Sequence, residues 1–147
     1  MSKFLEAIKV IGTPHIVLTD KYGNIKQEFS VPNLVVNAGK TIIAARLVGS
    51  GGVLTHMALG TGTTAALVAN TALQAETARV DLSSQSSSGA TSQYVASFGA
   101  GVATGAITEA GIFTASSGGN MLCRTVFAVV NKSADDIMSI TWSLTIQ

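Results

Sequence analysis

The stretch with the strongest chemical character is glycine-rich. Residues 60–64 read Gly-Thr-Gly-Thr-Thr, directly after a short apolar run. A loop of this kind binds phosphate when a helix follows it, because the amide N–H groups at the helix N-terminus then face the anion. The Gly-Lys-Ser or Gly-Lys-Thr ending of such a loop does not follow Thr64, and the second cluster, Gly99–Gly105, precedes a strand-like run. We therefore interpret both clusters as turns and expect no nucleotide cofactor.

Residues for nucleophilic catalysis are few. A serine or cysteine nucleophile needs a neighbouring base, and the sequence has two histidines, His15 and His56. His56 lies between Thr55 and Met57 in an apolar run, which indicates a hydrogen-bonded structural histidine. Cys123, the single cysteine, excludes an internal disulfide and has apolar neighbours, so we expect a buried thiol.

The acidic residues also favour structure over catalysis. Asp135 and Asp136 are adjacent in an expected loop, so they do not have the separation that glycosidases use. Glu109 stands among small and apolar residues, and a buried carboxylate needs a partner. Arg124, on the neighbouring strand of an expected hairpin, is the candidate, and we predict a structural Glu109–Arg124 pair. With so few His, Cys, Asp and Glu residues, we expect no metal, no cofactor and no enzymatic activity.

Short strands are the elements expected to carry these residues. In the last segment, apolar residues from Met138 to Ile146 alternate with Ser and Thr, and this period of two predicts a half-buried strand. A Gly-Asn turn at 23–24 predicts a hairpin, and a Ser-rich turn is expected over 83–90. Eight strands are predicted, over residues 15–19, 25–31, 55–59, 78–83, 91–98, 107–114, 121–130 and 137–146.

One segment has the spacing of a helix. Between Asn37 and Gly49, the residues Ile42, Ile43 and Arg46 recur at helical spacing, with Asn37 as the expected N-cap and Gly49 as the C-terminal stop. Many strands and one helix predict an all-β fold, either an antiparallel jelly roll or a β-sandwich with one short α-helix. The length of 147 residues fits one domain over 1–147.

Composition limits the partners. Charged residues make up 12% of the sequence, roughly half the share usual in soluble domains. Such a surface is expected to be partly covered by partner proteins; a monomer coated with Ser and Thr is the alternative. The nine Lys and Arg residues are scattered and the net charge is +1, so we expect no nucleic-acid partner. No apolar run approaches a membrane span, and Glu6 and Lys9 interrupt the N-terminal run, so we expect no membrane contact and a cytosolic protein.

The N-terminal stretch carries a separate hypothesis. Phe4, Leu5 and Ile8 are apolar residues separated by charges. Residues 1–12 are expected to form an arm that folds onto a neighbouring subunit, or else a frayed terminus or a short helix on the chain's own core.

Several ordered motifs resemble small virion structural proteins of tailed bacteriophages. They are a T-H-M-A-x-G-x-G-T-T stretch, a T-x-L-x-x-E-x-x-R segment and an E-A-G-[IL]-F hairpin, and the resemblance covers about residues 30–147. The matching residues are Thr55, His56, Met57, Ala58, Gly60, Gly62, Thr63, Thr64, Thr71, Leu73, Glu76, Arg79, Glu109, Ala110, Gly111, Ile112 and Phe113.

The resemblance implies a structural role. The leading hairpin and the end at Gln147 are most similar to podophage head cement, or decoration, proteins. Such a protein would bind the outer face of the capsid in the virion, after assembly in the bacterial cytoplasm, and would stabilise the shell against packaged DNA. Its implied partners are the major capsid protein and further copies of itself, as dimers or trimers. A tail-collar or tail-fibre attachment protein shares the E-A-G-x-F core and is the alternative; a small-ligand or glycan-binding sandwich is the third.

Overall fold

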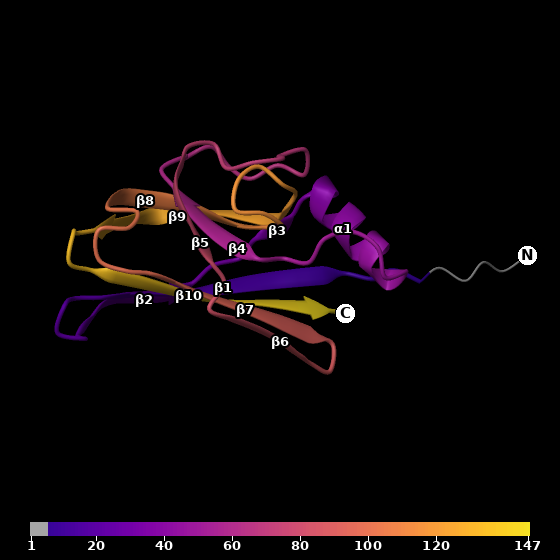
Figure 1. The fold of residues 1–147 in the computed structure, drawn as a ribbon, viewed down its shortest axis with the longest axis horizontal. Helices are drawn as coiled ribbons and strands as arrows, with labels where there is room; N and C mark the ends of the chain where they lie inside the picture. Colours follow the sequence, from indigo (N-terminus) through magenta and orange to yellow (C-terminus); the bar gives the residue numbers. More distant parts are fainter. Residues whose placement is uncertain (1–5) are drawn as a thin grey trace, which may run out of the picture.

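Residues 6–147 fold into a two-layer β-sandwich with one helix. The computed structural model describes residues 6–147 (Figure 1). In that part the strands are β1 (Val10–Thr19), β2 (Ile25–Ser30), β3 (Leu34–Val35), β4 (His56–Gly60), β5 (Glu76–Asp81), β6 (Ser84–Ser88), β7 (Thr91–Phe98), β8 (Gly105–Phe113), β9 (Met121–Lys132) and β10 (Ile137–Ile146), and the helix is α1 (Asn37–Leu47).

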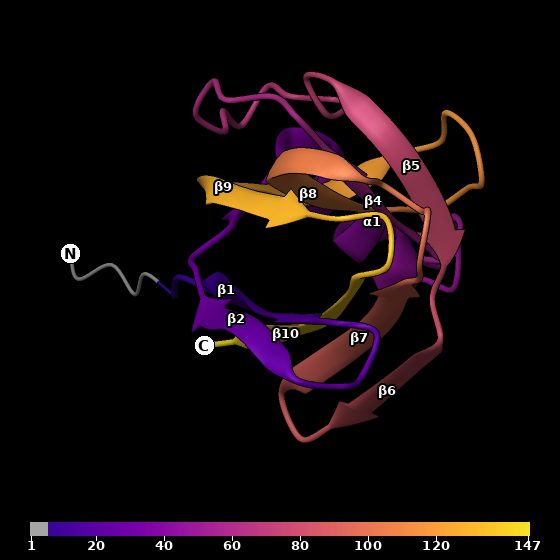
Figure 2. The same ribbon diagram turned by 90° about the vertical axis from the view of Figure 1, so that its left-hand side faces the viewer.

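The strands form two sheets that pack face to face (Figure 2). Sheet A has the order β2-β1-β10-β7-β6, and sheet B has the order β3-β9-β8-β4-β5. All strand pairs are antiparallel, and the consecutive pairs β1–β2, β4–β5, β6–β7 and β8–β9 each lie within one sheet. The predicted all-β antiparallel fold with one short helix is therefore confirmed. The sequence left a jelly roll and a β-sandwich open, and the strand order is that of a sandwich.

The core lies between the sheets and follows from alternation along the strands. In β10, Met138, Ile140 and Trp142 are fully buried, whereas the serines and threonines between them face outward and are half-buried. This confirms the predicted period of two. Burying each large apolar side chain stabilises the fold by about 1.5–3 kcal/mol, so β10, the central strand of sheet A, is a main source of stability.

The helix begins and ends where the sequence predicts, but its N-cap differs. Val36 occupies the N-cap position and makes no side-chain cap, because valine has no hydrogen-bonding group in its side chain. That side chain is instead fully buried against sheet B. The backbone N–H of Asn37 instead donates to the carbonyl of Val68 (2.8 Å). Asn37 as N-cap was therefore wrong. Gly49, with φ +71°, follows the helix as the predicted stop. Among residues 6–147 no helix has the length and apolar character to cross a membrane.

The Ser-rich segment 83–90 is mostly strand rather than turn. Residues 84–88 form β6, which pairs with β7 in regular register, and only Gly89 and Ala90 make the turn. Gly89 has φ +56°, a value that glycine adopts without a steric penalty. The prediction of a turn was wrong because serine has no strong strand preference of its own, and pairing with β7 determines the conformation.

From Lys9 onward the N-terminal part of the chain belongs to the sandwich. The backbones of Lys9 and Gln147 exchange two hydrogen bonds of 2.7 and 2.8 Å, and β1 pairs with β10 from Val10 onward. The arm expected over residues 1–12 is therefore wrong for residues 9–12, which pair with the chain's own last strand. For the residues before Lys9 the arm stays a prediction. Ile8 is 70% exposed, and Phe4 and Leu5 lie outside the described residues.

The contact of α1 with sheet B gives a test of the fold. Gly39 packs against β9, and a Cβ at this position would overlap the carbonyl oxygen of Leu122. Replacing glycine by alanine in a helix normally stabilises it by about 1 kcal/mol. We expect Gly39→Ala to destabilise the protein by about 1–3 kcal/mol, because overpacking outweighs this gain.

Urea denaturation measures this effect, with Lys40→Ala as the control. Lys40 is the next residue of α1 and is exposed, so its replacement should leave the free energy of unfolding nearly unchanged. A Gly39→Ala variant that is more stable than the wild type would show that α1 does not lie against β9 as described.

Candidate functional site

The glycine-rich stretch forms the start of a long loop that covers sheet B. Residues 61–75, called here the roof loop, connect β4 to β5 and have no regular secondary structure. The loop lies on the side of sheet B that faces away from sheet A (Figure 1 and Figure 2). Beneath it is a second small core, formed by Val36, Ala58, Leu73, Phe113 and Met121.

Glu109 and Arg124 meet under the roof loop. Glu109 lies on β8 and Arg124 on the adjacent strand β9, and their side chains are 0% and 2% exposed. The Nη2 and Nε atoms of Arg124 lie 2.9 and 3.0 Å from the Oε2 atom of Glu109. The structure thus brings together the two residues that the sequence singles out as a pair.

The carboxylate holds both ends of the roof loop. Its Oε1 atom accepts hydrogen bonds from the backbone N–H groups of Gly62 (3.0 Å) and Ala75 (2.7 Å). Its Oε2 atom accepts a further bond from the backbone N–H of Gln74 (2.9 Å), in addition to those from Arg124. Glu109 therefore joins the start and the end of the loop to β8, the central strand of sheet B.

The guanidinium group holds the middle of the loop. Arg124 donates to the carbonyl of Thr64 (2.9 Å) and to the side-chain oxygen of Asn70 (3.0 Å). The same Asn70 oxygen accepts the backbone N–H of Leu67 (2.8 Å). Because the loop has no internal ladder of hydrogen bonds, these side-chain contacts determine its path.

The two glycines of the Gly-Thr-Gly run are explained by the same carboxylate. A Cβ on Gly60 would lie 2.5 Å from the Oε1 atom of Glu109, and a Cβ on Gly62 would lie 2.6 Å from it. Glycine allows the backbone to approach this closely. The glycine-rich loop does surround an anion, but the anion is the chain's own carboxylate rather than a phosphate.

The environment of Glu109 keeps it ionised and unreactive. Burial alone would raise the pKa of Glu109, but hydrogen bonds from Ala75, Gln74, Arg124 and Gly62 lower it below its ordinary value of 4.5. Both oxygens are occupied by donors, and the side chain is fully buried. A general acid needs a proton and access to substrate. This carboxylate has neither, so its chemistry is structural.

A second arginine fixes the hairpin loop between β8 and β9. Arg79 on β5 forms a two-pronged pair with Glu76 (2.7 and 3.1 Å) and lies 3.7 Å from the ring centre of Phe113. It also donates to the carbonyls of Ala115 (2.9 Å) and Gly118 (2.8 Å). The Glu and Arg of the T-x-L-x-x-E-x-x-R segment thus hold a second loop near the roof loop.

The remaining candidates have structural surroundings. His56 contacts the hydroxyl of Thr55 (2.7 Å) and the carboxylate of Asp81 (2.9 Å). Cys123 is fully buried, and burial raises the pKa of its thiol. Within residues 6–147 no group of three or more His, Cys, Asp and Glu side chains is placed to hold a metal ion.

Sequence reasoning missed one buried carboxylate. Asp136 is 3% exposed, and its carboxylate accepts hydrogen bonds from Lys26 (2.7 Å) and from the backbone N–H of Ser133 (2.8 Å). It follows a second aspartate in a short segment between two strands, so no local pattern distinguishes it from a solvated loop residue. The contact with Lys26 appears only when β2 and the β9–β10 turn are brought together by the fold.

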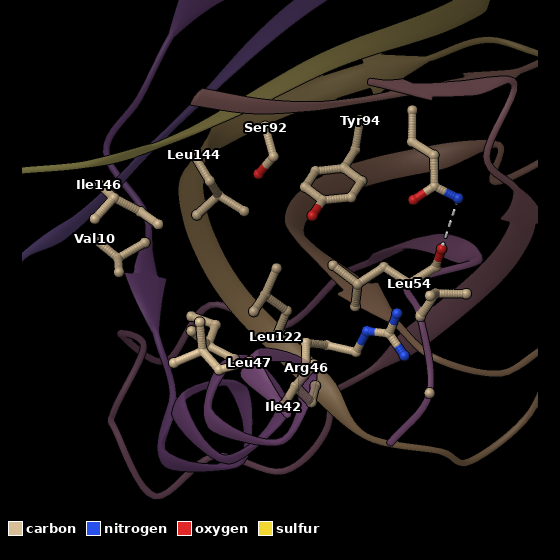
Figure 3. Close-up of a pocket in the computed structure, with 14 residues that line it drawn as sticks. Val10, Ile42, Arg46, Leu47, Leu54, Ser92, Tyr94, Leu122, Leu144 and Ile146 are labelled. Carbon is tan, nitrogen blue, oxygen red and sulfur yellow. Dashed lines mark hydrogen bonds between the residues drawn. The ribbon is translucent and has the colours of Figure 1, made fainter. Parts of the chain in front are cut away.

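Sequence reasoning also missed a pocket of about 310 Å³ between α1 and the inner side of sheet A. Arg46 and Ile42 of α1 face Tyr94 and Ser92 of β7 across it (Figure 3). Its other lining residues are mainly apolar and include Val10, Leu54, Leu122, Leu144 and Ile146. A small ligand, if the protein binds one, would occupy this pocket. Trp142, the one tryptophan, is fully buried in the core and offers no exposed platform for a glycan.

No family model, no curated protein and no solved structure matched the chain in comparisons with known proteins. What the protein does is therefore inferred from its own residues and their geometry.

Removing the charge of Glu109 should destabilise the protein strongly. Glu109→Gln leaves Arg124 as a buried charge without its partner and places an NH₂ group against backbone N–H donors. Breaking a buried pair in this way costs about 3–5 kcal/mol. Urea denaturation measures the loss, and Glu28→Gln is the control because Glu28 and its partner His15 are 47% and 42% exposed. A loss below about 1 kcal/mol, as for a surface pair, would contradict the account.

The same pair predicts a dependence on pH. A carboxyl group whose folded-state pKa is lowered stabilises the fold above its unfolded-state pKa, and this contribution is lost as the pH falls through the folded-state pKa. The free energy of unfolding should therefore fall more steeply below about pH 4.5 in the wild type than in Glu109→Gln. Asp20 and Asp136 also have lowered pKa values but are present in both proteins. Equal slopes in the two proteins would show that Glu109 is not the group responsible.

Proposed function

We propose that the chain is a non-enzymatic structural protein of a tailed-bacteriophage head, a cement protein that binds the outer face of the capsid. The observation that carries this proposal is the outer face of sheet A, which is open and has no charged residue over four of its five strands, β1, β10, β7 and β6. The motifs described above supply the link to phage virions.

The outer face of sheet A is built from the outward positions of five strands, and four of these strands contribute no charged residue. On the fifth, the edge strand β2, Glu28 faces Val17 in the register and contacts His15 (2.9 Å). The alternation of burial and the register of the strands place these residues of the other four on the face: Ile11, Thr13, His15, Val17 and Thr19 of β1; Ile137, Ser139, Thr141, Ser143 and Thr145 of β10; Thr91, Gln93, Val95 and Ser97 of β7; and Ser84, Ser86 and Ser88 of β6. These positions in the four strands contain no Lys, Arg, Asp or Glu.

A face with so few charged residues suits contact with another protein. Charged residues are depleted from the centres of protein interfaces, because a buried charge without a partner is costly. Hydroxyl and amide side chains form hydrogen bonds either with water or with a partner, so the face is compatible with both states. Some hydroxyls already pair on the face itself, as Thr91 and Thr145 do (2.9 Å).

The opposite side of the molecule offers a second contact surface, which supports the same role. The roof loop is tied to sheet B by Glu109 and Arg124, yet its tip exposes Leu67 and Val68, which are 58% and 44% exposed. A protein that bridges subunits needs contact surfaces on more than one side. A cement protein adds many modest contacts of about 800 Å² per partner, which together stabilise a shell. We propose the major capsid protein as the partner.

Copy number tests the proposal. In purified particles of the phage that encodes the chain, quantitative protein staining should give on the order of hundreds of copies, in a simple ratio to the major capsid protein, because every equivalent position of the shell is occupied. About six to twelve copies would contradict the cement role and favour attachment at the tail collar, where the symmetry is low. Absence from purified particles would contradict both.

A further inference from the structure

The four sheet edges differ in how well they are protected from pairing with another chain. Edge strands are usually guarded by charges, by bulges or by being short. Edge β2 carries Lys26 and Glu28, and edge β3 has only two residues. Edge β5 carries Glu76, Arg79 and Asp81, and its pairing with β4 contains an irregularity.

Edge β6 has none of these protections. Its sequence is Ser-Gln-Ser-Ser-Ser over residues 84–88, all five residues are exposed, and its register with β7 is regular. It contains no charge and no proline. In both views of the molecule β6 is the outermost strand of sheet A (Figure 1 and Figure 2). Of the four edges, β6 is therefore the one left able to accept a further strand.

The free backbone groups of β6 belong to Gln85 and Ser87. The β6–β7 hairpin has a two-residue turn, Gly89 and Ala90, and the residues that flank it are Ser88 and Thr91. In a hairpin with a two-residue turn, the flanking residues form a hydrogen-bonded pair. Ladder pairs alternate along antiparallel strands, so Ser86 also directs its backbone groups toward β7. Gln85 and Ser87, which alternate with it, direct their N–H and C=O groups toward the open edge.

We propose that β6 pairs with β6 of a second copy of this chain, antiparallel and about a two-fold axis at Ser86, so that two A sheets become one continuous sheet. In this register Ser86 faces Ser86 of the second copy. Gln85 faces Ser87 of the second copy, and Ser87 faces its Gln85. The free N–H and C=O groups on each side thereby meet their complements. The pairing needs only two copies of the chain and does not depend on a capsid.

The absence of charge is what makes self-pairing feasible here. A two-fold axis brings identical residues together, so a charged strand would place like charges opposite each other and repel its copy. The outward positions of β6 and of the next strand, β7, contain only Ser, Thr, Gln and Val. Few apolar side chains lie at the edge, so we expect a weak, concentration-dependent dimer, which is best detected by a covalent trap.

Ser86→Cys supplies that trap. The only native cysteine, Cys123, is fully buried, so the new thiol is the accessible one. Residues facing each other in a non-hydrogen-bonded antiparallel pair have Cα atoms about 4.5 Å apart, which is within the range of a disulfide. Under mild oxidation we expect a disulfide-linked dimer on a non-reducing gel.

Ser88→Cys is the matched control, since it has the same residue type, strand and face. In the proposed register its thiol would lie roughly 13 Å along the strand from that of the second copy, beyond disulfide reach. We expect Ser86→Cys to link at least about tenfold faster than Ser88→Cys. A mixture of Ser84→Cys and Ser88→Cys proteins should link to each other, because residue 84 faces residue 88 of the second copy in this register.

Adding Ser87→Pro to Ser86→Cys removes an N–H group at the open edge and no bond to β7, so it should slow linking to the rate of the control. Circular dichroism checks that this variant is folded. Two results would overturn the proposal. One is equal linking rates for Ser86→Cys and Ser88→Cys, and the other is failure of the Ser84→Cys and Ser88→Cys proteins to link to each other. Because these measurements use the purified chain alone, their failure is distinguishable from failure of the capsid role.

Discussion

The buried pair of Glu109 and Arg124 is the interaction on which the rest of sheet B depends. Taking a carboxylate and a guanidinium out of water is unfavourable by several kcal/mol per ion unless each finds partners. Here the partners are the two charges themselves and the backbone groups of the roof loop at Gly62, Thr64, Gln74 and Ala75. The loop without secondary structure and the buried charges therefore stabilise each other.

This arrangement gives the two faces of the sandwich different characters. The outer face of sheet B is covered by the roof loop and its small core, whereas the outer face of sheet A is open and carries hydroxyl and amide groups. The pocket beside α1 is lined on one side by the helix, at one end of the sandwich. The covered side, the open side with few charges and the unprotected edge β6 are the features that support the proposed contacts with other proteins.

An element of this fold could be predicted from the sequence when its own residues determine its conformation, and could not be when contacts with distant residues do. The period of two in β10 and the turn at Gly23 are local signals, and they predicted the right elements. Glu109 and Arg124 could be paired from the sequence because a carboxylate among apolar residues needs a partner on a neighbouring strand. Strand β6, by contrast, owes its conformation to pairing with β7. The first backbone N–H of α1, that of Asn37, donates to the carbonyl of Val68 in the roof loop. Neither feature has a signal in its own residues.

Hydrogen exchange of three backbone amides tests the central claim most directly. The N–H groups of Gly62, Gln74 and Ala75 donate to Glu109, and they lie in a loop that has no other ladder to protect it. If the buried carboxylate holds the roof loop, these amides exchange nearly as slowly as those of β8 and β9. If they exchange as fast as the exposed turn at Gly23, while β8 and β9 remain protected, the carboxylate does not hold the loop and the account is contradicted.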